Sequence, residues 1–191
     1  AAEPQAGLEI AGADAAIKGE IEFRGTDFSY EDQPVLQDVN IRVPAGGTLA
    51  VVGRVGSGKT TIARLIPSLI RAGAGQVLID GMPIEEIPVG KLREAIGYVP
   101  QDSFLFSDTL RENIALGAEG ADAERAADIA QLTPDVADFP AGMETIVGER
   151  GVTLSGGQRQ RTALARAVVR DPRILILDDA LVSVDTHTEE E

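Results

Sequence analysis

The 191-residue sequence contains no cysteine and no tryptophan, and it has a single histidine. Without cysteine the chain forms no disulfide and offers no thiolate to a metal, which suits a reducing compartment. No apolar run approaches the roughly 18 to 20 residues of a membrane-spanning helix, and no charged-then-apolar leader opens the sequence. We therefore expect any membrane role of this chain to depend on a partner.

Basic residues are also scarce. The sequence has 17 Lys and Arg against 31 Asp and Glu, which gives a formal net charge of -14. Proteins that follow a nucleic-acid backbone usually present a basic face, so this balance argues against a nucleic-acid partner. The acidic residues are spread along the chain, as on a solvated surface. The length allows one domain with a sizeable core, or a core with one insertion.

The most informative stretch is LAVVGRVGSGKTT, residues 49–61. Four apolar residues, 49–52, predict a short buried strand, and Lys59 begins a helix that we expect to continue to Arg71. The loop between them has the spacing of a phosphate-binding loop: Gly, four residues, Gly, Lys and Thr. The alternative is a glycine turn with a solvated lysine, which the strand before it and the helix after it disfavour.

The chemistry of such a loop explains its residue types. Glycines adopt positive φ and let backbone N–H groups approach phosphate oxygens, and the N–H groups of the helix start add to the same field. Lys59 would neutralise the β- and γ-phosphates, and the Thr60 hydroxyl would bind Mg²⁺. The residues that we assign to ATP binding here are Gly53, Arg54, Val55, Gly56, Ser57, Gly58, Lys59, Thr60 and Thr61.

The rest of the sequence alternates strand and helix patterns around a helical middle. The Ala- and Gly-rich residues 1–19 suggest a linker or frayed terminus. Polar–apolar alternation predicts two antiparallel strands that form a small β layer, and apolar runs predict three later strands, the last buried on both faces. The predicted strands are 20–24, 40–43, 76–81, 96–99 and 173–177, with a turn at 31–34, and the predicted helices are 89–95, 109–116, 122–131 and one beginning at 156.

A second constellation lies near the end of the sequence. Ser155 can cap the helix that follows, and two glycines leave its first N–H groups open to an anion. Alone, this pattern also fits an ordinary serine cap before an amphipathic helix. The apolar run 174–177 then delivers the carboxylate of Asp178, as a Walker B element does. Ser155, Gly156, Gly157 and Gln158 are therefore candidates for binding an anion.

At this point the sequence resembles the nucleotide-binding domain of an ATP-binding cassette (ABC) transporter, from residue 20 to its end. The ordered motifs that carry the resemblance are Tyr30 in the adenine-stacking A-loop, Walker A at 53–61, Gln101 in the Q-loop, the signature at 154–158, Asp178 in Walker B and the D-loop at 183–185. The segment 145–151 is similar to the X-loop of ABC exporters, and residues 106–107 and 111–114 are typical of the same class. The resemblance therefore implies export.

The resemblance also implies the fold, cofactors and partners. It implies an α/β fold: a P-loop NTPase core with an N-terminal antiparallel β layer and a helical insertion subdomain. The expected parts are a linker at 1–19, the β layer and first part of the core at 20–101, the helical signature subdomain at 102–169, and a return to the core at 170–191.

The cofactors that the resemblance implies are ATP and Mg²⁺, with Asp178, Thr60 and Gln101 at the metal and Gln101 also near the attacking water. Two such domains pair head to tail at the cytoplasmic face of a membrane, below transmembrane domains expected before residue 1.

The sequence departs from the family pattern after Walker B. Members that hydrolyse ATP well carry Glu there to polarise the attacking water, whereas this chain has Asp179, a carboxylate one methylene shorter. General-base placement contributes about 10²–10⁴-fold to such rates. An Asp beside an intact signature resembles the slow-site subunit of a heterodimeric exporter; the alternative is a slower, symmetric enzyme.

The switch histidine of the family has no counterpart here, because His187 is too close to Asp185, and we interpret it as an exposed histidine. The sequence therefore looks like a fragment that ends before the switch region. Two further functions stay open: a regulatory module that mostly holds ATP, or a soluble ABC protein of DNA repair or translation. The X-loop and the acidic charge disfavour the second of these.

Overall fold

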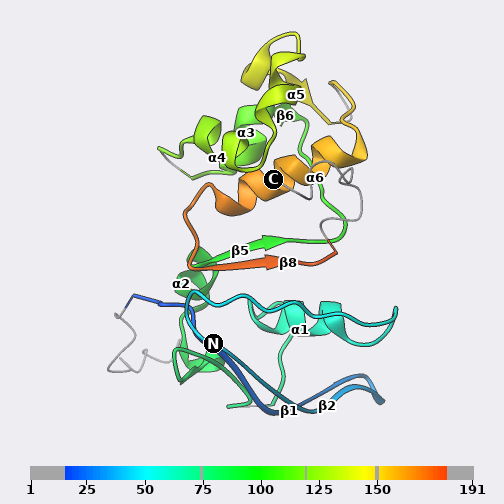
Figure 1. Ribbon diagram of the computed structural model, residues 1–191, viewed down its shortest axis with the longest axis vertical. Coiled ribbons are helices and arrows are strands. Elements are labelled where there is room, and N and C mark those ends of the chain that lie inside the picture. The colour runs from blue at the N-terminus through cyan, green and yellow to red at the C-terminus, as the bar shows by residue number, and fades with distance from the viewer. Residues whose placement is uncertain (1–15, 74, 119, 149–150, 180–191) are drawn as a thin grey trace, which may run out of the picture. The chain divides into compact units, whose positions relative to one another are not determined.

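The computed structural model describes residues 16–73, 75–118, 120–148 and 151–179. The chain divides into two compact units, residues 1–93 and 94–191, and each is described by itself (Figure 1). Most of the predicted linker, the D-loop at 183–185 and His187 lie outside the described residues.

The first unit is built on an antiparallel sheet. Strands β1 (Ile21–Tyr30) and β2 (Gln33–Val43) form a long hairpin, and the sheet order is β2-β1-β3-β4, with β3 (Val77–Ile79) and β4 (Met82–Pro83). This confirms the predicted N-terminal β layer. The strands are longer than predicted, because three register shifts in β1 break the alternation of inward and outward side chains on which the prediction depended.

A tight turn joins β3 to β4. Asp80 and Gly81 both have positive φ, +53° and +81°, as a two-residue type I′ hairpin turn requires. The Asp80 carboxylate accepts hydrogen bonds from the backbone N–H groups of residues 18–20, the shortest at 2.6 Å. This side chain therefore fixes where the chain enters β1.

Helix α1 (Lys59–Leu65) is shorter than the predicted helix, which extended to Arg71. Pro67 has no backbone N–H with which to continue the helical hydrogen bonds, whereas Ile66 before it still has helical angles, φ of -62° and ψ of -48°. The chain then turns at Ser68, where φ is +52°, and the Leu69 N–H donates to the Arg64 carbonyl. The prediction was wrong at this end because it followed apolar residues past a proline. The unit continues with the 3₁₀ turn η1 (Ile84–Glu86) and α2 (Val89–Glu94).

The predicted buried strand at 49–52 is also wrong. These residues form no strand, and Val52 is 89% exposed. Apolar composition alone does not make a strand, because each backbone N–H and C=O also needs a partner. Within the described part of the first unit, β1 to β4 pair with one another and not with this segment.

The second unit contains a two-stranded parallel sheet covered by a long helix. Strand β5 (Ile96–Val99) pairs with β8 (Ile174–Leu177), and α6 (Gly156–Val168) packs on one face through Ala163 and Ala167 against Val99. The approach is close: a Cβ at Gly97 would lie 2.4 Å from the carbonyl oxygen of Ala167. Strand β5 matches its predicted bounds, and β8 begins one residue later than the predicted strand at 173–177.

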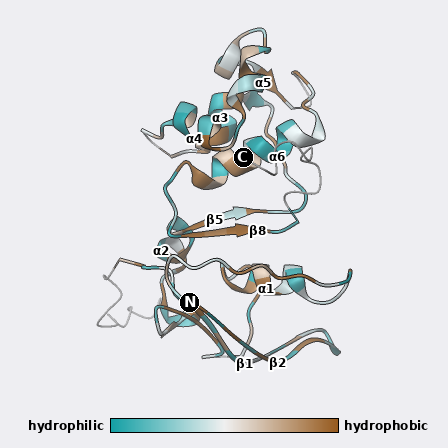
Figure 2. Ribbon diagram, viewed as in Figure 1, coloured by the Kyte–Doolittle hydropathy of each residue, from teal (hydrophilic) through white to brown (hydrophobic). Residues whose placement is uncertain are grey.

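Strand β8 is hydrophobic along its whole length (Figure 2). Its side chains nevertheless alternate between buried and exposed, and Leu175 is 46% exposed. The expectation of burial on both faces was therefore wrong for this unit, because α6 covers only one face of the pair.

The helical insertion has its own small core. It comprises α3 (Leu110–Ala115), α4 (Ala123–Ile129), α5 (Thr133–Ala137), η2 (Gly142–Glu144) and the short antiparallel pair β6 (Asp108–Thr109) and β7 (Ile146–Val147). The first two helices were predicted within one or two residues, whereas the others are too short to show periodicity. The core residues are Leu110, Ile114, Ala123, Ala126, Ala127, Ala130, Leu132, Val147, Leu154 and Ala165. Among the described helices, none is long and apolar enough for a membrane span.

Candidate functional site

The second half of the phosphate loop has backbone angles that favour glycine. Gly56 and Gly58 have φ of +82° and +90°. A Cβ added at Gly58 would lie 2.7 Å from Leu36 Cδ2, and one at Gly53 would lie 2.5 Å from Ser57 Oγ. The missing side chains at Gly53 and Gly58 therefore leave room for the backbone to approach an oxyanion.

Lys59 folds back over this loop. Its Nζ donates to the carbonyl oxygen of Gly53 at 3.0 Å and to that of Arg54 at 3.2 Å. The ammonium group is thus held at the loop, while the loop residues 53–57 are exposed. An anion bound by the loop would meet a fixed positive charge.

Tyr30 lies on the strand pair that supports the loop. Tyr30 is 43% exposed, and its ring lies edge-on to the Phe28 ring, with 4.8 Å between the ring centroids. Phe28 pairs across the hairpin with Leu36, the residue that a Cβ on Gly58 would meet. The first unit therefore places an exposed aromatic residue on the hairpin that packs against the phosphate loop at Gly58.

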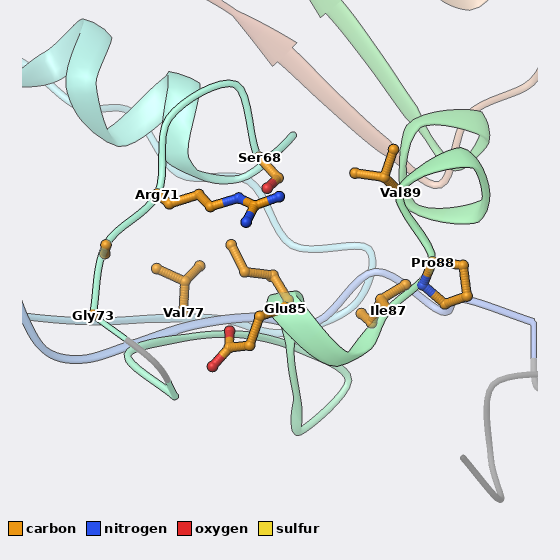
Figure 3. Close-up of a pocket in the computed structure, with 10 residues that line it drawn as sticks. Ser68, Arg71, Gly73, Val77, Glu85, Ile87, Pro88 and Val89 are labelled. Carbon is orange, nitrogen blue, oxygen red and sulfur yellow. The ribbon is translucent and has the colours of Figure 1, made fainter. Parts of the chain in front are cut away.

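A cavity of about 400 Å³ also occurs in the first unit (Figure 3). It lies between the segment that follows α1 and the η1–α2 segment, with Ser68 and Arg71 on one side and Glu85 and Val89 on the other. None of the residues predicted to bind nucleotide lines it. The cavity is therefore distinct from the candidate nucleotide site.

The signature motif begins α6 with a capping box. Ser155 is the N-cap: its Oγ accepts from the Gln158 N–H at 3.2 Å, and the Gln158 side chain accepts from the Ser155 N–H at 2.9 Å. The predicted serine cap is confirmed. The two side chains satisfy two donors of the helix start and fix its geometry.

Asp135 on α5 supports this helix start, and sequence reasoning missed it. Its Oδ1 accepts from Gln158 Nε2 at 3.1 Å, and its Oδ2 accepts from Arg161 Nε and Nη2 at 3.0 and 2.8 Å. The side chains of Asp135 and Arg161 are 20% and 19% exposed. The only signal in the sequence was an acid in a segment too short to be predicted as a helix.

Asp178 lies at the carboxyl end of β8 and is 5% exposed. Its backbone N–H donates to the Val99 carbonyl at 2.9 Å, and its Oδ2 accepts from the Tyr98 hydroxyl at 3.1 Å. Gln101 follows β5 at the same end of the pair and is exposed. This edge is where parallel sheets of α/β proteins usually carry ligands. Tyr98 was predicted only as a strand residue.

Asp179 differs from its neighbour. It is exposed, and its backbone is left-handed, with φ of +51°. A non-glycine residue in this region is uncommon and often marks a functional position. Its role as the water-polarising residue stays a prediction.

A half-buried cation joins α6 to the segment that follows Gln101. The Arg166 guanidinium donates to the carbonyl oxygens of Phe104 and Asn113 at 2.8 and 2.7 Å and to Asn113 Oδ1 at 3.1 Å. Burial lowers the pKa of this side chain from its ordinary value. The link makes the signature helix and this segment parts of one scaffold.

The predicted site residues fall into two groups. Tyr30 and the phosphate loop lie in the first unit, whereas Gln101, Asp178, Asp179 and the signature at 154–158 lie in the second. The predicted Mg²⁺ ligands Thr60, Gln101 and Asp178 all offer oxygen atoms, which Mg²⁺ prefers. This donor set leaves coordination positions for phosphate oxygens and water, as is usual for Mg²⁺ in nucleotide sites.

Comparisons with known proteins agree with these motifs. The family model described as "ABC transporter" matches residues 36–182. The uncharacterized ABC transporter ATP-binding protein YwjA of Bacillus subtilis is 46% identical over 179 residues, which cover 92% of this chain and 31% of the relative. An ATP-dependent lipid A-core flippase of Syntrophus aciditrophicus is 44% identical over 178 residues, covering 92% of this chain and 30% of the relative.

A solved structure is also similar. It is a bacterial Atm1-family ABC exporter with ATP bound, with a TM-score of 0.87 and 41% identity. The match covers 97% of this chain and 33% of the solved one. The chain therefore spans about a third of the length of the proteins it matches.

Proposed function

The chain belongs to the ABC transporter family, and we propose that it is the ATP-binding and ATP-hydrolysing motor domain of an exporter. The observation that carries this proposal is the phosphate loop, in which glycines are required by backbone angle and by space and Lys59 is held against the loop. Domains of this family bind ATP with Mg²⁺, and the match to an exporter with ATP bound supports the same role here.

Each predicted residue then has a stated task. The loop at 53–58 and Lys59 bind the phosphates, and Tyr30 takes the adenine face. Thr60, Gln101 and Asp178 would hold Mg²⁺, which would neutralise charge on the phosphates. Asp179 orients the attacking water, and the Tyr98 hydroxyl holds the Asp178 carboxylate in place.

The partners in this proposal are a second nucleotide-binding domain and transmembrane domains. Paired head to tail, the helix start at Ser155 faces the γ-phosphate held by the other domain, where its N–H groups stabilise negative charge. The domain would work at the cytoplasmic face of the membrane. The matched proteins are about three times longer than this chain, which leaves room for a transmembrane part in the full protein.

Asp179 supports a finer proposal, that the second domain is not identical. In a heterodimer this chain's own site is slow, and its signature completes the partner's competent site. The runner-up is a regulatory module whose site mostly holds ATP, and Asp179 favours that function as well. Single-turnover hydrolysis in the paired protein separates the two, because a slow motor releases phosphate whereas a holding site does not.

Steady-state ATP hydrolysis by the full-length transporter tests the pairing. Ser155→Arg blocks the helix start that faces the partner's phosphate, so we expect most activity to disappear; loss of one oxyanion donor alone costs about 10²–10³-fold. Asp179→Asn removes only the base of the slow site and should cost little. If Asp179→Asn is as damaging as Ser155→Arg, the assembly is symmetric with an aspartate base.

A further inference from the structure

The feature of interest is the set of side chains behind the signature helix start. Gln158 uses both ends of its amide: Oε1 accepts from the Ser155 N–H, and Nε2 donates to Asp135 Oδ1. The amide has one orientation that satisfies both neighbours. Asp135 therefore determines which way Gln158 points, and Gln158 in turn closes the capping box on Ser155.

The charges in this set are balanced. The second oxygen of Asp135 accepts two hydrogen bonds from Arg161, one turn further along α6 than Gln158. An unpaired carboxylate so close to the helix start would repel an anion, and Arg161 offsets it. Among the described residues, the hydrogen bonds found for the Arg161 guanidinium are those to Asp135. The pair thus supplies an acceptor for Gln158 without adding net charge near the helix start.

We propose that Asp135 is a positioning residue for the signature, acting through Gln158 to hold the start of α6 in the geometry that receives the γ-phosphate of the partner domain. The inference rests on the proposed function, because it assumes that the signature meets a phosphate. Asp135 itself touches no part of the nucleotide in this proposal. Its role is to make the helix start rigid before the two domains pair. The helix start then needs no reorganisation when negative charge develops on the γ-phosphate.

The first test is ATP hydrolysis by the full-length transporter carrying Asp135→Ala. We expect kcat to fall about tenfold, as for loss of a residue that orients a functional group. KM for ATP should change much less, because the phosphate loop is untouched. Asp138→Ala is the matched control, since it removes the same charge from an exposed residue, the C-cap of α5. An equal loss in the control would overturn the proposal.

A charge-balanced variant separates positioning from electrostatics. Asp135→Ala/Arg161→Met restores the net charge of the wild type near α6 but leaves Gln158 Nε2 without its acceptor. We expect hydrolysis to stay low in this double variant. Recovery to the wild-type rate would show that Asp135 only cancels the charge of Arg161, and the proposal would be wrong.

A double-mutant comparison tests whether Asp135 acts through Gln158. If Asp135 acts through this amide, Asp135→Ala/Gln158→Ala should have the same kcat as Gln158→Ala alone; multiplied losses would overturn the inference.

The same set of variants identifies failure of the underlying function, ATP hydrolysis with the signature at the site. If Gln158→Ala leaves hydrolysis unchanged, the signature does not serve an ATP site, whereas a damaging Gln158→Ala with a harmless Asp135→Ala refutes only the role of Asp135.

Discussion

The two elements that we propose to bind phosphate are built in opposite ways. The phosphate loop in the first unit owes its shape to side chains that are missing: a Cβ at Gly53 would lie 2.5 Å from Ser57 Oγ, and one at Gly58, where φ is +90°, would lie 2.7 Å from Leu36 Cδ2. The signature helix start in the second unit owes its shape to side chains that are present, through the contacts among Ser155, Gln158 and Asp135. The phosphate loop should therefore lose its function when a side chain is added to one of its glycines. The signature helix start should lose its function when one of its hydrogen bonds is removed.

The largest effect should come from the charge of the phosphate loop. Lys59→Ala removes the ammonium that the loop holds at Gly53 and Arg54, so tight Mg-ATP binding should be lost while the fold remains. Nucleotide affinity and circular dichroism are measured on one sample. Lys91→Ala, on α2 of the same unit, is the control for loss of a positive charge. Unchanged affinity in folded Lys59→Ala protein would contradict the assignment.

The second largest effect should come from changing the backbone shape of the phosphate loop. Gly58→Ala forces an L-residue to φ of +90° and brings its Cβ against Leu36. We expect a cost of about 1–3 kcal/mol in unfolding free energy from the backbone angle alone, together with weaker ATP binding. The measurements are denaturant unfolding and ATP titration.

The control for this change is Gly90→Ala in α2. A Cβ there meets nothing within 4 Å, and its φ is not positive. This variant should be neutral or more stable by about 0.5–1 kcal/mol, since alanine suits a helix better than glycine. If both glycines tolerate alanine equally, the loop is not shaped by missing side chains.

Tyr30, the proposed adenine platform, should contribute a smaller amount to ATP binding. Tyr30→Ala should weaken ATP binding by roughly 1–3 kcal/mol if the exposed ring stacks on the base, whereas Tyr30→Trp should be nearly neutral. Isothermal titration with ATP measures both variants. The stacking role is wrong if the tryptophan variant unfolds while the alanine variant binds ATP normally.

The smallest predicted effect is a pH dependence in the helical insertion. Hydrogen bonds from Arg111 to Glu124 and Glu144 join α3, α4 and η2, and the hydrogen bond from Arg111 lowers the pKa of Glu124 below its ordinary value of 4.5. A lowered pKa in the folded state means that this stabilisation is full above the ordinary value and is lost as pH falls through the folded value.

Thermal unfolding as a function of pH measures this contribution. The wild type should lose more stability on acidification below about pH 4.5 than Glu124→Gln, which lacks the titrating group. The difference should shrink at high salt, because the pair is exposed. Parallel curves for the two proteins at all pH values would show that the ion pair contributes nothing.

Local patterns in the sequence determined much of this protein. The spacing at 53–61 predicted the glycine-shaped loop, the Ser155 pattern predicted the cap of α6, and the apolar runs predicted β5 and β8, because each depends on residues within one turn or one strand. The order of these motifs identified the ABC family, which the comparisons confirmed. The D-loop and His187 lie outside the described residues and stay predictions.

Only the tertiary structure decided which distant groups meet. Asp135 is 23 residues from Gln158, Tyr98 is 80 residues from Asp178, and Arg166 is 62 residues from the carbonyl of Phe104 that it contacts. No periodicity in the sequence encodes such pairs, because they depend on how helices pack on strands. For the same reason, apolar composition predicted burial of residues 49–52 and of both faces of β8, whereas actual burial depends on which neighbours cover them.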